Sequence, residues 1–187
     1  SLGDLRIGGR YRILGDEDDD FRLAAQFDMT LPMARWVDGN SAYTGDRTVT
    51  GHPELVAQYQ AGRARLVAQV GARLRRGSQY GGLEVGHDLT YALGAAVAVA
   101  DGDVDLIAEL HGGTAFNDFF GRENSPLEII GGFKMFADNG IVFGGGAGPG
   151  LTRGFGSPDV RFFAMLGYSA PAEADPVDSD GDGPHLD

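Results

Sequence analysis

Three aspartates near the C-terminal end of the chain have the spacing of ligands for a hard cation. Asp178, Asp180 and Asp182 occupy alternate positions in the segment DSDGDG, and a glycine follows the third of them. Carboxylate oxygens are ligands that Ca²⁺ prefers, and a glycine permits the sharp turn of such a loop. The segment presents two alternatives, a calcium site or a solvated acidic linker, and the two prolines that precede it fit the linker.

The sequence contains no residue pattern typical of an enzyme. Without cysteine, the chain has no disulfide, thiol nucleophile or zinc–thiolate site. Its four histidines are scattered, without an HExxH pair, and no serine stands in a G-x-S-x-G context. The run GGGAGPG is followed by neither a helical pattern nor a Lys-Ser/Thr pair, which disfavours a phosphate-binding loop. We therefore predict that the protein is not an enzyme.

The formal net charge of −12 disfavours a nucleic-acid partner, because nucleic acids require a basic face. The acidic run DEDDD at 16–20 is predicted to form a charged turn, since five adjacent acids cannot all face one ion. No stretch approaches 18 consecutive apolar residues, so the sequence predicts no transmembrane helix. An all-β globular protein and a membrane β-barrel both remain open.

Most of the chain alternates apolar and polar residues with a period of two, the pattern of a strand with two different faces. In the segment 21–33, odd positions carry Phe, Leu, Ala or Met, and most even positions carry Arg, Gln, Asp or Thr. Short Gly-, Asp- and Asn-rich turns predict antiparallel hairpins. The pattern predicts about nine strands, at 5–14, 21–33, 54–60, 63–76, 83–99, 104–113, 127–136, 140–148 and 158–169.

Alternation fits both a soluble barrel with an apolar interior and a membrane barrel with a polar one, and three features favour the membrane barrel. Strands of about 10–13 residues tilted near 45° span about 23–30 Å, which matches the apolar band of outer-membrane barrels. The polar face is rich in Arg, whose planar guanidinium suits a confined interior, and the chain has a single Lys. Aromatic residues near strand ends predict an interfacial girdle, formed by Phe21, Trp36, Tyr59, Tyr80, Phe136 and Tyr168.

We predict that charged side chains of the polar face form a network in the barrel interior. His111 shares this face with Glu109, and a charge network is favoured there over an acid–base dyad. Single-chain bacterial barrels have even strand numbers, so a count of nine leads us to expect further strands upstream. The residues assigned to the network are Arg6, Arg10, Arg12, Arg22, Arg63, Arg65, Arg73, Arg75, Glu84, Asp105, Glu109 and Glu128.

Four segments carry a family resemblance: LGDLRIGGRYRIL, FRLAAQFDMTLP, GAGPGLTRGFGSPDVRFFAMLGYS and DSDGDG. Together they resemble OmpA-family outer-membrane proteins of the myxobacterial type, over nearly the whole chain. The most specific feature is the pairing of GLTRGFGSPDVRFF with DSDGDG. The resemblance implies an N-terminal β-barrel, then thrombospondin type 3-like repeats that bind calcium, and then a periplasmic peptidoglycan-binding domain.

The resemblance also implies a division of the chain. Residues 1–170 would form the barrel, without the first strands of a parent of about twelve, and residues 171–187 a Pro/Asp-rich linker that begins a calcium repeat. Such a repeat takes ligands from positions 1, 3, 5 and about 9. Leu186 stands at position 9, one residue before the next acid, so the implied ligand set is Asp178, Asp180, Asp182 and Asp187.

We therefore expect an all-β, antiparallel, up-and-down transmembrane β-barrel in the outer membrane of a Gram-negative bacterium, with its tail in the periplasm. The expected function is a porin-like channel, a structural anchor between the outer membrane and the periplasm, or both. The expected cofactor is calcium in the tail. The expected partners are membrane lipid and lipopolysaccharide, peptidoglycan through a further C-terminal domain, and an envelope assembly. The alternative is a soluble or surface-displayed, calcium-stabilised β-module for adhesion or assembly.

Overall fold

The computed structural model describes residues 3–16, 18–33, 36, 48–80, 83–154 and 156–169. About two thirds of these residues lie in β-strands, and a short 3-10 helix, η1 (Ala100–Gly102), lies between two strands. Among them, no helix is long and apolar enough to cross a membrane. The strands are β1 (Leu5–Leu14), β2 (Phe21–Leu31), β3 (Thr50–Ala61), β4 (Ala64–Arg73), β5 (Ser78–Tyr80), β6 (Leu83–Val85), β7 (Asp88–Val99), β8 (Val104–Ala115), β9 (Leu127–Phe136), β10 (Ile141–Pro149) and β11 (Val160–Tyr168).

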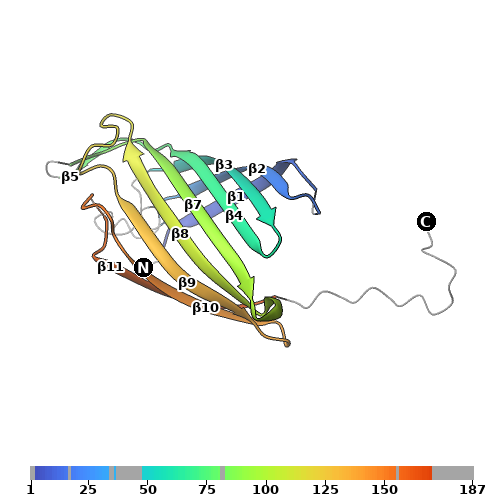
Figure 1. Ribbon diagram of the computed structural model, residues 1–187. Helices are drawn as coiled ribbons and strands as arrows, with labels where there is room; N and C mark the ends of the chain where they lie inside the picture. The colour runs from blue at the N-terminus through green and yellow to red at the C-terminus, as the bar shows by residue number, and fades with distance from the viewer. Residues whose placement is uncertain are drawn as a thin grey trace, which may run out of the picture.

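Nine strands form one antiparallel sheet in the order β1-β2-β3-β4-β7-β8-β9-β10-β11 (Figure 1). β5 and β6 pair with each other as a separate hairpin between β4 and β7. The predicted all-β, up-and-down, antiparallel fold with about nine strands is confirmed. β1 and β11 are the two edges of the sheet, and the described strands include no pairing between them. Closure into a barrel stays a prediction.

The pairing register sorts the side chains of the sheet into two faces. On what we call the apolar face, Leu93 of β7 lies between Ala68 of β4 and Leu110 of β8. On the polar face, the neighbouring strands carry charged, amide, hydroxyl and small side chains opposite one another, as where Gln26 lies opposite Glu54. The period-two pattern of the sequence thus becomes two chemically distinct surfaces.

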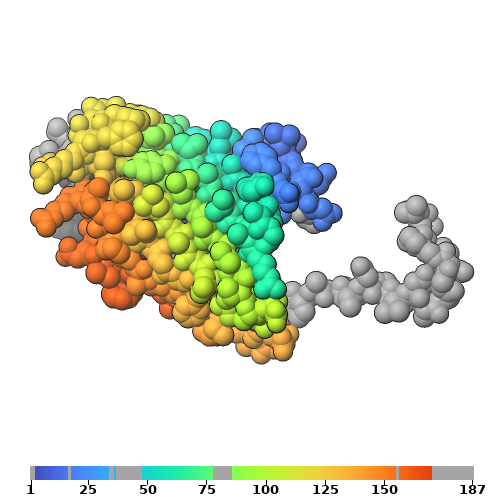
Figure 2. Space-filling view, viewed as in Figure 1, coloured from blue at the N-terminus to red at the C-terminus, as the bar shows by residue number. Residues whose placement is uncertain are grey.

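The exposure of the two faces is the reverse of that in an ordinary soluble sheet. Leu93, in the middle of the apolar face, is 58% exposed, whereas Glu54 on the polar face is 6% exposed. Figure 2 shows β4, β7, β8 and β9 as an uncovered outer surface. The polar face is therefore buried by the curling of the sheet upon itself (Figure 1).

Short turns and long loops alternate strictly along the sheet. Because neighbouring strands are antiparallel, all four short turns lie at one end, the short-turn end, and all four long loops at the other, the long-loop end. The short turns are 15–20, 62–63, 100–103 and 137–140. The long loops are 32–49, 74–87, which includes the β5–β6 hairpin, 116–126 and 150–159.

One predicted strand is divided in the structure. The segment predicted as a strand at 83–99 forms β6 and β7, which are separated at Gly86 and His87. The Arg75 side chain donates from Nε to the Gly86 carbonyl at 2.9 Å, and the Arg75 backbone N–H donates to His87 Nδ1 at 3.2 Å. These bonds hold Gly86 and His87 outside the sheet ladder.

Candidate functional site

Most of the acidic strand residues of the polar face lie opposite glycines. Four of them lie directly opposite a glycine of the neighbouring strand or loop: Asp28 opposite Gly8, Glu54 opposite Gly71, Glu109 opposite Gly94, and Glu128 opposite Gly150. At Gly71, an added Cβ would lie 2.7 Å from Cγ of Glu54 and 2.8 Å from the Pro53 carbonyl oxygen. Because Gly71 has no side chain, the Glu54 side chain can lie directly against the sheet.

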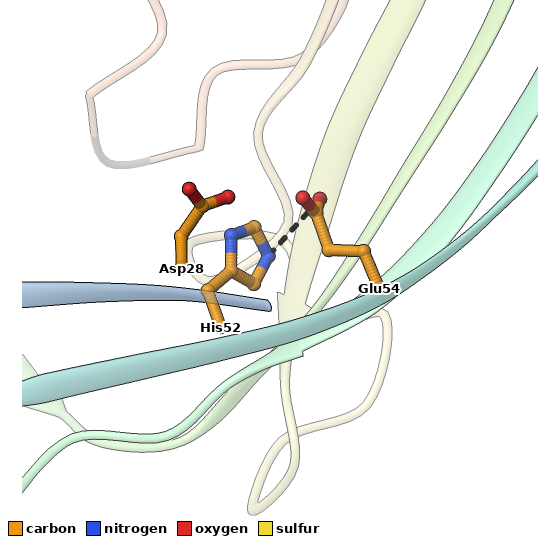
Figure 3. Close-up of side chains that lie close together, drawn as sticks. All are labelled: Asp28, His52 and Glu54. Atoms are coloured by element: carbon orange, nitrogen blue, oxygen red, sulfur yellow. Dashed lines mark ion pairs between the residues drawn. The ribbon is translucent and has the colours of Figure 1, made fainter. Parts of the chain in front are cut away.

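Three of the polar-face residues form a compact cluster on β2 and β3 (Figure 3). Asp28 and His52 are cross-strand neighbours, and Glu54 lies two residues further along β3 on the same face. One ligand atom from each lies within 4.8 Å of the others, and His52 Nε2 is 3.4 Å from Glu54 Oε1. The His52 ring lies between the two carboxylates.

Protein donors already surround this cluster. The Gln26 amide donates to Asp28 Oδ2 at 2.7 Å and to Glu54 Oε2 at 3.3 Å. Arg6 Nη2 donates to Asp28 Oδ2 at 3.0 Å, and the Gln69 amide donates to Glu54 Oε1. His52 Nε2 also shares a hydrogen bond of 2.8 Å with the hydroxyl of Thr90 on β7. The network thus connects five consecutive strands of the sheet.

An imidazole with two carboxylates is a ligand set that suits a divalent transition-metal ion such as Zn²⁺. Arg6 supplies a positive charge beside Asp28, and Gln26 and Gln69 occupy carboxylate oxygens of Asp28 and Glu54. A cation would have to displace these donors. The arrangement is complete as a hydrogen-bond network, and we assign the cluster to the charge network of the polar face.

Replacing Gly71 by valine should destabilise the sheet, because the new side chain would displace the Glu54 carboxylate and contact the Pro53 carbonyl. We expect a loss of about 1–3 kcal/mol in unfolding free energy, the usual cost of overpacking. Denaturant titration of the refolded protein measures it. Gly131→Val on β9 is the matched control, since no atom lies within 4 Å of its added Cβ. Equal losses in the two variants would contradict the positioning role of Gly71.

Two ion pairs join strands that are not adjacent, and each crosses an intervening strand that carries small residues. Arg65 Nη2 on β4 reaches Asp105 Oδ2 on β8 at 3.2 Å, across alanines of β7. Arg161 on β11 reaches Glu128 on β9 across glycines of β10, with Nε to Oε2 at 2.8 Å and Nη2 to Oε1 at 3.0 Å. The second pair has the two-bond geometry of a strong Arg–carboxylate contact. Small intervening side chains allow both pairs to form.

The remaining polar-face pairs do not cross an intervening strand. Asp88 binds two arginines, with Arg73 Nη1 at 3.3 Å and Arg75 Nη2 at 3.0 Å. His111 lies opposite Glu128 in the register, with Nε2 3.6 Å from Glu128 Oε2. The predicted companion of His111, Glu109, lies on the same face of the strand but is not the carboxylate that faces the ring.

The structure brings most of the predicted network together. Six of the predicted residues form ion pairs among the side chains of the polar face and its margin: Arg6, Arg65, Arg73, Arg75, Asp105 and Glu128. Arg10 donates to the Gln26 side chain at 2.6 and 2.9 Å instead of to an acid. Arg12 pairs with Asp16 at 3.8 Å, and Arg22 donates to the Asp19 carbonyl at 3.3 Å. These two therefore tie β1 and β2 to their turn.

Other predicted residues lie elsewhere. Arg63 lies in a short turn and pairs with Asp101 of the next short turn at 3.7 Å, so it is not on the polar face. Glu84 lies in β6, outside the nine-stranded sheet. The predicted linker at 171–187 lies outside the described residues, as do the calcium ligands predicted there, Asp178, Asp180, Asp182 and Asp187.

The period-two alternation puts Asp28 and Glu54 on the polar face, but it does not show that they meet His52. The signal was present in the pairs Gln26-x-Asp28 and His52-x-Glu54, because residues two apart on a strand share a face. Two such pairs on consecutive strands meet when the register aligns them. The alternation alone does not specify the register in which β2 and β3 pair.

The polar face also contains open space. A hollow of about 290 Å³ is lined by Arg65, Gln69 and Glu109, together with small and apolar residues of β4, β7 and β8. The charged side chains therefore do not fill the region enclosed by the curled sheet. Water or small ions have access to this space beside a guanidinium and a carboxylate.

Comparison of the chain with models of known protein families and with curated protein sequences found no match. These comparisons therefore assign no roles to the residues of the polar face. Their roles follow from the strand register, the ion pairs and the exposure of the two faces.

Proposed function

We propose that the nine strands form the wall of an outer-membrane β-barrel, with the apolar face toward lipid and the polar face toward the interior. The barrel serves as a narrow channel and as an anchor between the outer membrane and the periplasm. The reversed exposure of the two faces carries this proposal. Each exposed leucine costs free energy in water, at about 25 cal/mol per Å² of apolar surface, and this cost disappears in hydrocarbon.

The dimensions of the sheet support the same assignment. The nine strands contain 9–12 residues each. At about 3.3 Å per residue and a tilt near 45°, they would span about 21–28 Å. The apolar band of an outer-membrane barrel is about 25 Å tall, with short periplasmic turns and longer extracellular loops. The alternation of turn lengths described above is the same asymmetry.

Four exposed aromatic side chains on the apolar face lie near the short-turn end. Tyr11, Phe21, Tyr59 and Tyr168 are all exposed there, as expected for side chains at the boundary between lipid and water. Phe136, a predicted member of this girdle, lies instead on the polar face, with Lys134 Nζ 4.7 Å from its ring centroid. The girdle is thus formed by residues that point outward at the strand ends.

Strand direction constrains how such a barrel closes. β1 and β11 are separated by eight antiparallel pairings, so they run in the same direction. Direct pairing between them would be parallel, and an all-antiparallel barrel needs an odd number of further strands in the gap. Open sheet edges are costly in hydrocarbon because their backbone groups lack partners. Three further strands would give the expected barrel of about twelve.

The anchor role depends on where β11 ends. Tyr168 lies at the short-turn end, which is periplasmic in outer-membrane barrels. The chain therefore leaves the sheet toward the side where the proposal places the calcium-binding segment and the attachment to peptidoglycan. The proposal includes calcium as the cofactor of that segment only.

Membrane extraction tests the proposed location. We expect the protein to sediment with the outer-membrane fraction, to remain there after washing with high salt and alkaline carbonate, and to enter solution only with detergent. A protein held by charge alone leaves the membrane in salt, because surface electrostatic attraction is screened. Release by carbonate without detergent would contradict the barrel and support the soluble β-module.

A further inference from the structure

We propose that the polar face binds small inorganic anions, such as chloride or inorganic phosphate, and that the barrel passes them in preference to cations. The permeation step rests on the proposed function, whereas anion binding requires only the polar face itself. The inference follows from the number, depth and donor capacity of the charged side chains that line this face.

The polar face carries more cations than acids, although the chain as a whole has a net charge of −12. Strand residues on this face include eight cations and six acids, a net charge of +2. The cations are Arg6, Arg10, Arg12, Arg22, Arg65, Arg73, Lys134 and Arg161. The acids are Asp28, Glu54, Asp88, Asp105, Glu109 and Glu128. Much of the negative charge lies elsewhere, in the short turns and in the C-terminal segment.

On the polar face, most carboxylates are more deeply buried than the guanidinium groups that bind them. The side chains of Glu54 and Asp105 are 3% and 13% exposed, so these carboxylates lie against the wall of the sheet. The side chains of Arg6, Arg65 and Arg161 are 60%, 44% and 47% exposed. A carboxylate is short and a guanidinium stands at the end of a long stem, so the arginines extend over their acidic partners. A solute in the interior therefore meets guanidinium groups before carboxylates.

Arg161 also has more N–H donors than its carboxylate partner uses. A guanidinium carries five N–H groups, and a bidentate carboxylate uses only two of them. Arg161 binds Glu128 through Nε and Nη2. The donors that remain can bind an anion without breaking the ion pair. Glu109 is the exception to the separation by depth, because its side chain is an exposed carboxylate at the hollow that also contains Arg65.

A lining of this kind discriminates by charge. Inside a low-dielectric wall, exposed cations raise the local concentration of anions and lower that of cations. Rings of Arg or Lys have this role in anion-selective pores. The hollow of about 290 Å³ accommodates ions of the size of chloride or phosphate.

Ion permeation provides the first test. With the purified full-length protein in a planar bilayer and a KCl gradient, we expect the reversal potential to show chloride more permeant than potassium by about threefold or more. The double variant Arg65→Gln/Arg73→Gln should lose this preference. Arg63→Gln is the matched control, because Arg63 lies in a turn off the polar face. A conducting pore that is unselective or prefers potassium would overturn the inference and leave the proposed channel standing.

Anion binding provides a test that needs no open pore. In detergent micelles, titration with inorganic phosphate should shift the ¹⁵Nε–¹H resonances of arginines on the polar face, and Arg65→Gln should remove one of them. The Arg63 resonance should remain unchanged. Wild-type protein that binds phosphate but does not conduct would contradict the channel and support the anion site. If the resonances of the polar-face arginines did not shift when phosphate was added, the anion site would be overturned.

Discussion

Leu93→Arg should destabilise the protein by about 2–4 kcal/mol, the cost of a charged residue at the midplane of a lipid-facing barrel surface. Leu93 lies at the middle of β7, the central strand of the nine, and 58% of its surface is exposed. An exposed leucine in a soluble protein tolerates this change within about 0.5 kcal/mol. The variant therefore separates lipid exposure from water exposure. The measurement is denaturant unfolding of protein folded into lipid vesicles.

The control for Leu93→Arg is the same substitution near the strand end. Val99 lies on the apolar face of the same strand, at its short-turn end, where a long cationic side chain can reach water. We expect Val99→Arg to cost about 1 kcal/mol or less, because the penalty falls toward the interface. A Leu93→Arg protein that unfolds at the wild-type denaturant concentration would contradict a lipid-facing apolar surface.

Glu54→Leu should be the most damaging single change on the polar face, at about 2–4 kcal/mol of unfolding free energy. The Glu54 carboxylate accepts hydrogen bonds from the amides of Gln26 and Gln69 and lies beside His52. Its side chain is 3% exposed, so water cannot replace the lost acceptor without local opening. Leucine would leave both amides without this partner. Denaturant unfolding in the same vesicles measures the loss.

Two further variants separate lost hydrogen bonds from lost charge. Glu54→Gln keeps the shape and one acceptor oxygen, so we expect it to cost about 1 kcal/mol, the net contribution of one hydrogen bond. The double variant Glu54→Leu/Gln69→Leu should be more stable than the sum of its single changes predicts, because no Gln69 amide is then left without its Glu54 acceptor. Additive losses would show that Glu54 and Gln69 act independently.

The strands and their two faces could be predicted because both depend on local sequence. A period of two assigns a strand and its polar face wherever it persists, as in β2 and β8. The break between β6 and β7 was not predicted, although His87 stands at an apolar position of the alternation and Gly86 at a polar one. Its cause is Arg75, eleven residues away from Gly86 along the chain. The apolar/polar alternation of the sequence does not show that Arg75 contacts Gly86.

The pairing of charges depends on information that alternation does not carry. Arg65 and Asp105 are 40 residues apart and belong to strands that are not adjacent. Their contact depends on the register of two pairings and on small residues of β7 between them. Likewise, Arg63 follows the alternating pattern but falls in the turn, because β3 and β4 are joined there by two residues. Register and turn position therefore decide which predicted charges meet.

The central claim, that the apolar face contacts lipid, is tested most directly by spin-label accessibility along β7. Because the chain contains no cysteine, single cysteines at each position from Ala92 to Val97 can be labelled uniquely in the vesicle-embedded protein. We expect labels at the odd positions, including Leu93, to be relaxed by oxygen, which dissolves in hydrocarbon. Labels at the even positions should respond to a water-soluble nickel complex. Odd positions that respond to the nickel complex, with no alternation, would contradict the lipid-facing barrel wall.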